Sequence, residues 1–141
     1  MNEGPRAVRA VARLSRTLEC SLASLSPSLT LAQYRVLAAV DDGGERATHL
    51  AHGLAVAKPT VTAAVDGLVE RNLVTREPVP GDRRSLRIAL TATGRTVLAA
   101  ADSAMTQQLA EVVAATGQDP AASLATLARL APIPGGAHAR A

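Results

Sequence analysis

Apolar residues recur at helical spacing in the first part of the chain. From Pro5 to about Leu25, one face collects them at intervals of three and four: Ala7, Val8, Val11, Leu14, Leu18, Leu22 and Leu25. Pro5 suits the first turn of a helix, and the run Ser26-Pro27-Ser28 interrupts the pattern. The spacing therefore predicts one helix over this stretch.

A second helix is predicted in LAQYRVLAAV, residues 31–40. Thr30 stands before it and Gln33 follows three residues later, which is the spacing of a capping box. The next residues, Asp41-Asp42-Gly43-Gly44, predict a turn. A short third helix, HLAHGL, is then expected behind a Thr48 cap.

A fourth helix is predicted from about Pro59 to Arg71. Four apolar residues share one of its faces: Val61, Ala64, Val65 and Leu68. Asn72 is suited to the left-handed conformation that ends a helix. The third and fourth helices therefore form a pair of short helices joined by a brief linker.

After Asn72 the pattern changes from helical spacing to alternation. Strands are predicted over Leu73–Pro78 and Leu86–Leu90, joined by PGDRRS, in which Pro80-Gly81 makes the turn. Two neighbouring arginines at this tip, Arg83 and Arg84, repel each other far from any core. A contact with a negatively charged partner would account for them.

A long helix is expected next, from about Gly94 to Ala115, capped by Thr91 or Thr93. Its apolar stripe is typical of a coiled-coil seam: Val97 or Leu98, Ala101, Met105, Leu109 and Val112. A last short helix carries Leu124, Leu127 and Leu130 and ends at Pro132. Disorder is expected for residues 135–141.

Composition narrows the fold class and the partner. Among 141 residues Tyr34 is the one Phe, Tyr or Trp, so Leu, Val and Ala must build the core, which favours packed helices. Fourteen Arg and Lys58 give a formal net charge of +3 and a pI near 10, which suits a nucleic-acid partner. The single cysteine, Cys20, excludes an internal disulfide. With no apolar leader and no bilayer-spanning run, a cytoplasmic protein is expected.

The order of these elements predicts a mostly α fold with a small β-hairpin wing, a winged helix-turn-helix. The second helix of such a pair is sized for the major groove of duplex DNA. The hairpin beside it reaches the neighbouring minor groove, whose narrow stretches attract arginine. Contact with DNA would therefore explain the two arginines of the tip.

Two stretches of the sequence, residues 29–40 and 48–95, resemble the MarR family of bacterial transcription regulators. The strongest likeness lies in TVTAAVDGLVERNLV and GDRRSLRIALTATGR, where the L-T-x-x-G-R phrase begins the long helix after the wing. The resemblance spans roughly residues 29–98. It implies that the first and last helices dimerise, with a dimerisation helix in residues 1–27, a DNA-binding lobe in 28–92 and further dimerisation helices in 93–134.

The resemblance also implies which residues contact DNA. The recognition-helix positions that face bases and phosphates are Lys58, Pro59, Thr60, Thr62, Ala63 and Asp66. On the wing, Arg84 matches the arginine that enters the minor groove, and Asp82 matches the acid that steadies it. Arg83 matches a phosphate contact, and Ser85 completes the wing site.

This recognition helix departs from the family pattern. Ala57 stands where relatives often place a capping serine, which costs about 1 kcal/mol by rule. Ala63 and Gly67 stand where relatives often carry arginine, and a mid-helix glycine costs roughly another 1 kcal/mol. Sequence preference is therefore expected to rely on the wing and on DNA shape.

The function implied by the resemblance is repression by a homodimer on a pseudo-palindromic operator in duplex DNA, relieved by a small molecule. The effector pocket is expected to be aliphatic, because Phe and Trp are absent, with Tyr34 and Arg35 as its candidate residues. Neither a cofactor nor a membrane partner is expected. No spacing suggests a nucleophile with a base, a phosphate loop or a carboxylate pair, so catalysis is not expected.

Three other side chains have a bland and a functional interpretation. Cys20 is either a small residue in a helix contact or the thiol of an oxidant-sensing repressor. His49 and His52 have a spacing that metal sites use, yet no third ligand lies near in sequence, so no metal is predicted. A winged-helix module that binds protein rather than DNA is the alternative from another class, favoured by the lack of long side chains on the recognition helix.

Overall fold

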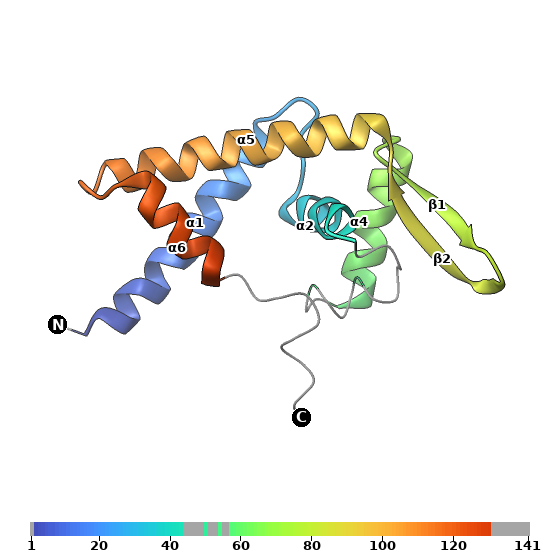
Figure 1. The fold of residues 1–141 in the computed structure, drawn as a ribbon, viewed down its shortest axis with the longest axis horizontal. Helices are drawn as coiled ribbons and strands as arrows, with labels where there is room; N and C mark the ends of the chain where they lie inside the picture. Colours follow the sequence, from blue (N-terminus) through green and yellow to red (C-terminus); the bar gives the residue numbers. More distant parts are fainter. Residues whose placement is uncertain (1, 44–49, 51–53, 55–56, 131–141) are drawn as a thin grey trace. The chain divides into compact units, whose positions relative to one another are not determined.

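The computed structural model describes residues 2–43, 50, 54 and 57–130. Over these residues the chain forms five helices and one antiparallel hairpin, coloured along the sequence in Figure 1. It divides into two compact units. The central unit spans Leu29–Ala101, and the terminal unit combines the residues up to Ser28 with those from Asp102 onward.

Helix α2 (Leu31–Asp41) begins at the predicted capping box in the central unit. The Gln33 N–H donates to the Thr30 hydroxyl oxygen at 3.1 Å, and the Gln33 side chain accepts from the Thr30 N–H at 3.1 Å. The predicted third helix with its Thr48 cap lies outside the described residues, apart from Leu50 and Leu54, which are both helical. The Thr30–Gln33 capping box therefore begins α2 where the sequence predicted.

Helix α4 (Lys58–Glu70) begins at Ala57 without a side-chain cap and has proline in its first turn. The helix ends at Glu70, and Asn72 adopts the predicted left-handed conformation with a φ of 58°. The Leu73 N–H donates to the Leu68 carbonyl at 2.9 Å, and the Asn72 N–H donates to the Val69 carbonyl at 3.0 Å. These bonds form a Schellman motif, which turns the chain directly from the helix into a strand.

Strands β1 (Val74–Val79) and β2 (Asp82–Leu90) form the hairpin that projects past α4 in Figure 1. Pro80 and Gly81 join them, and Gly81 has a φ of 81°, which a glycine adopts without strain. The sequence predicted a loop from Pro80 to Ser85. That boundary was wrong, because β2 already begins at Asp82 and pairs with Val79.

Helix α5 (Ala92–Ala114) is capped by Thr91 rather than Thr93, since the Gly94 N–H donates to the Thr91 hydroxyl at 2.9 Å. The same hydroxyl donates to the Asn72 carbonyl at 2.8 Å. A Cβ on Gly94 would lie 1.9 Å from the Leu73 carbonyl oxygen. The threonine and the glycine of TATGR therefore allow the helix to begin directly against the end of the α4–β1 turn.

The core of the central unit is aliphatic. Helix α2 packs on α4, and strands β1 and β2 pack on α4 and α2 respectively. Its most deeply buried side chains are Leu37, Leu68, Leu73, Val36, Val74 and Ile88. Close approach of α2 and α4 depends on Gly67, because a Cβ there would lie 2.8 Å from the Gln33 side-chain nitrogen.

The terminal unit is built from α1 (Glu3–Ala23), the later part of α5 and α6 (Pro120–Leu130). Of its described apolar side chains, Leu22 and Met105 are buried. Several large ones are exposed: Val8 at 70%, Val11 at 62%, Leu127 at 40% and Leu130 at 72%. None of the described helices is both long and apolar enough to span a bilayer.

Candidate nucleic-acid interface

The predicted recognition helix has a clear exposed face. All six side chains assigned to DNA contact are exposed: Lys58, Pro59, Thr60, Thr62, Ala63 and Asp66. The opposite face is buried in the core of the central unit through Val61, Ala64, Val65 and Leu68. The helical spacing therefore placed these six residues together on the accessible side of α4.

Gly67 does not belong to that exposed face. It is half-buried and lies against Gln33 of α2. Arg71, one turn later, also donates to the Gln33 carboxamide oxygen at 3.3 Å. Gly67 is thus a point of close packing between α4 and α2, which the residue spacing within one helix could not show.

The wing arginines lie in a bulge of β2. Pro78 pairs with Leu86, whereas the next residue, Val79, pairs with Asp82. Three residues of β2 therefore have no opposite residue on β1: Arg83, Arg84 and Ser85. A bulge re-aims side chains that a regular ladder would hold perpendicular to the sheet, and both arginines here are exposed.

Asp82 holds this bulge through the backbone. Its carboxylate accepts the Arg84 N–H at 3.1 Å and the Ser85 hydroxyl at 2.6 Å. The carboxylate therefore fixes the main chain from which the Arg84 side chain projects. Asp82, Arg83, Arg84 and Ser85 are brought together as one braced basic tip.

Sequence reasoning missed two ion pairs that involve the hairpin. Arg76 of β1 forms an ion pair with Asp66 of α4. On the other hairpin face, Arg87 donates to Glu77 at 2.8 Å, and these two residues are directly opposite in the register. Strand alternation could have indicated the Glu77–Arg87 pair. The Asp66–Arg76 pair joins a helix to a strand, and the sequence does not show how these two elements pack.

The candidate pocket residues of α2 are engaged in packing. Tyr34 is half-buried, and the Arg35 guanidinium donates to the Leu54 carbonyl. Arg35 also lines a cavity of about 10 Å³ with Val36, Thr60 and other residues of the central unit. That volume is about the space of a single water molecule, so this cavity is too small for an organic effector.

A wider groove lies within the terminal unit, with a volume of about 550 Å³. Its lining is mostly polar and includes Cys20, Ser24, Gln107 and Glu111. Cys20 is an exposed free thiol. The thiol is therefore accessible.

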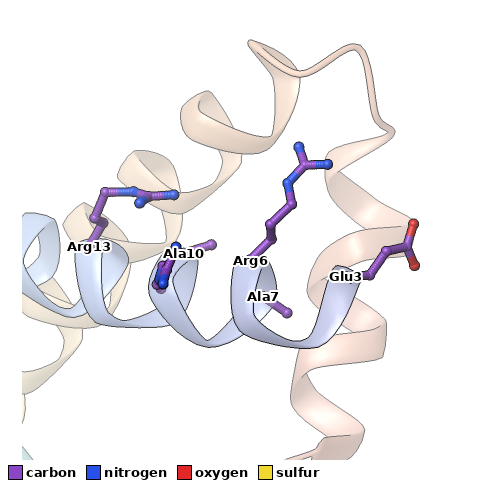
Figure 2. Close-up of a pocket in the computed structure, with 6 residues that line it drawn as sticks. Glu3, Arg6, Ala7, Ala10 and Arg13 are labelled. Atoms are coloured by element: carbon purple, nitrogen blue, oxygen red, sulfur yellow. The ribbon is translucent and has the colours of Figure 1, made fainter. Parts of the chain in front are cut away.

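A second basic surface lies on α1. Arg6, Arg9 and Arg13 line an open hollow of about 500 Å³ with Glu3, and Figure 2 shows Arg6 and Arg13 extending from the helix. One turn further along α1, a guanidinium nitrogen of Arg16 lies 3.6 Å from a carboxylate oxygen of Glu19. Basic charge is thus present in both units, and net charge by itself does not locate the DNA-binding surface.

Within the described part of the chain, no three His, Cys, Asp or Glu side chains lie close enough to hold a metal ion. His49 and His52, weighed above as ligands, lie outside the described residues.

Comparison with known proteins identifies the arrangement. Residues 28–85 match the family model described as MarR family, while no curated protein sequence matches the chain significantly. Wild-type MarR from E. coli in its apo form is 25% identical, with a TM-score of 0.78 over 94% of this chain and 98% of that one.

Two further solved structures are similar. The transcriptional regulator BldR from Sulfolobus solfataricus is 26% identical, with a TM-score of 0.68 over 79% of this chain and 83% of that one. RV1404 from Mycobacterium tuberculosis is 28% identical, with a TM-score of 0.67 over 91% and 90%. These structures confirm the predicted fold class, a mostly α winged helix-turn-helix with a β-hairpin wing.

Proposed function

This chain belongs to the MarR family of DNA-binding transcription regulators, and we propose that it represses transcription by binding a pseudo-palindromic operator as a homodimer. The observation that carries this proposal is the braced tip of the wing. Its two exposed arginines lie in a bulge held by Asp82, in the same compact unit as the exposed face of α4. The central unit therefore contains both α4, for the major groove, and Arg84, for the minor groove.

The recognition helix supports reading by shape more than by base edges. Its exposed face offers one long cation, Lys58, and the hydroxyls of Thr60 and Thr62. A good bidentate contact to a base edge is worth about 1–3 kcal/mol, and with no exposed Arg, Asn or Gln on this face Lys58 is its one long side chain that can make such a contact, to guanine. Minor-groove width, sensed by Arg84, then supplies much of the sequence preference.

Dimerisation is supported by the apolar side chains that the terminal unit leaves exposed, among them Val8, Val11 and Leu130. A twofold dimer buries the same patch on both protomers. It presents two recognition helices to two half-sites about one helical turn apart. The operator is therefore expected to be an inverted repeat.

Repression would follow from occlusion of the promoter, and relief from a small molecule that binds the two arrangements of the lobes unequally. The effector role is proposed from the family resemblance. Tyr34 and Arg35 are proposed to respond to the effector through the packing of α2, since the cavity beside Arg35 is too small for an organic ligand. The absence of Phe and Trp favours an aliphatic effector.

A selection from random duplex DNA provides the operator for the test. Arg84→Ala is expected to weaken operator binding roughly 5- to 160-fold at fixed salt, because one guanidinium contact to DNA is worth about 1–3 kcal/mol. Arg16→Ala, an exposed arginine of the terminal unit, is the matched control and should leave affinity unchanged. Equal affinity for wild type and Arg84→Ala, with both folded, would remove the wing from the interface.

Oxidant sensing through Cys20 is a second candidate, favoured by the exposure of the thiol in the groove of the terminal unit. It predicts that peroxide releases the wild-type protein from operator DNA and leaves Cys20→Ser bound. If peroxide has the same effect on both proteins, Cys20 is a packing residue only.

A further inference from the structure

The ion pair between Asp66 and Arg76 joins the two DNA-binding elements of the central unit. Asp66 lies on the exposed face of α4, among the residues assigned to DNA contact. Arg76 lies on β1, on the hairpin face that carries the buried Val74, and is directly opposite the buried Ile88. The side chains are 59% and 33% exposed respectively, so the pair lies at the solvent edge of the helix–wing packing.

This contact is a second link between two elements that are already joined at one end. The Schellman motif at Asn72 connects the end of α4 to the start of β1 through backbone hydrogen bonds. Arg71 ties the same end of the helix to α2 through Gln33. The packing of β1 on α4 also restrains the angle between helix and hairpin, and a directional ion pair away from the turn restrains it further.

The charge of Asp66 also requires an explanation. A carboxylate on a surface that meets phosphates opposes binding unless a cation compensates for it. Arg76 supplies that cation from the wing. An exposed pair of this kind adds little to fold stability, so its value lies in the geometry that it sets.

We infer that Arg76 is a positioning residue for DNA binding, whose ion pair with Asp66 sets the angle between the recognition helix and the wing. The inference rests on the proposed function. It adds a contact that holds α4 and the wing at the angle at which α4 enters the major groove and the wing enters the minor groove. Asp66 then acts on DNA through Arg76, and its carboxylate does not read bases.

The hairpin contains its own matched control. Glu77 and Arg87 also form an exposed carboxylate–guanidinium pair, on the opposite hairpin face. That pair joins β1 to β2 within the wing, whereas the Asp66 pair joins the wing to α4. Glu77→Gln removes one carboxylate from an exposed ion pair, as Asp66→Asn does, without breaking a contact between the wing and α4.

The test measures operator and scrambled-duplex binding across a salt series for Asp66→Asn, Arg76→Gln, the double variant and Glu77→Gln. Positioning predicts that each single Asp66 or Arg76 change weakens operator binding on the order of tenfold. The double variant should be no weaker than either single one, with an unchanged salt slope and unchanged scrambled-duplex binding. Arg76→Lys should retain most of the affinity, and Glu77→Gln all of it.

Two results would overturn the inference. If Arg76 contacts phosphate directly, Arg76→Gln weakens operator and scrambled DNA alike and lowers the salt slope by about 0.9. If Asp66 merely repels DNA, Asp66→Asn binds more tightly than wild type. Thermal unfolding of each variant verifies that the lobe is folded.

Arg84→Ala in the same assay separates this inference from the proposed function. A loss of binding in Arg84→Ala without loss in Asp66→Asn overturns the positioning role alone. No operator preference in the wild-type protein overturns the proposed function itself.

Discussion

The two compact units of the molecule treat their apolar residues differently. The central unit buries most of its large aliphatic side chains within itself, with Leu37, Leu68 and Ile88 at 0% exposure, while Leu86 on the wing is 45% exposed. In the terminal unit, α6 has no buried residue, and Val8 and Leu130 are 70% and 72% exposed. Exposed valine and leucine of this kind are typical of association surfaces, so the terminal unit is the part of the chain proposed to meet a partner protomer.

The comparison also explains how a core without Phe or Trp suffices. In the central unit, two glycines allow close contact between elements. Without a Cβ, Gly67 lies against the Gln33 side chain and Gly94 against the Leu73 carbonyl. Small residues at these crossings let aliphatic side chains fill the space at high density. The terminal unit shows no comparable crossing among its described glycines.

The largest expected effect is at Gly94. In Gly94→Ala the new Cβ would lie 1.9 Å from a backbone oxygen, which a flexible side chain cannot relieve. We expect a loss of about 3 kcal/mol or more in the free energy of unfolding, measured by urea denaturation. Gly4→Ala in the terminal unit, where the nearest atom is 3.4 Å away, should unfold like wild type.

Truncation of a core leucine should have the next largest effect. Leu68→Ala removes a fully buried side chain and should cost about 3 kcal/mol of unfolding free energy. Leu130→Ala, in α6, should change the unfolding of the isolated protomer by less than about 0.5 kcal/mol. Equal costs at the two sites would mean that the units do not differ as described.

How far the sequence alone leads can be judged from particular residues. Thr30 with Gln33, Asn72 and the exposed face of α4 were predictable because capping and helical spacing are local signals. The start of β2 at Asp82 was not, since a bulge breaks the alternation on which strand prediction depends. The Asp66–Arg76 pair depends on how a helix packs against a hairpin, and no local pattern records that.

Charge placed in the exposed apolar patch should separate the protomers. Val11→Glu introduces a carboxylate on the face proposed to meet the partner, and should raise the dimer dissociation constant at least tenfold, as measured by sedimentation equilibrium. Thermal unfolding of the central unit should be unchanged. Arg9→Glu, on another face of α1, is the control, and a similar dissociation there would point to a different interface.

The smallest expected effect is a gain at the start of the recognition helix. Ala57 provides no capping oxygen, so Ala57→Ser should add up to about 1 kcal/mol to the unfolding free energy. Thr30→Ala removes an existing cap on α2 and should cost a similar amount. No gain from Ala57→Ser would show that the first turn of α4 is already held by other contacts.

The most direct test of the central claim is the titration of the wild-type protein with its selected operator and a scrambled duplex at two salt concentrations. The account predicts sub-micromolar binding to an inverted repeat, at least tenfold preference over the scrambled duplex, and a steep loss of affinity with salt. Equal and weak binding to both duplexes would contradict it, and the protein-interaction function would then explain the fold better.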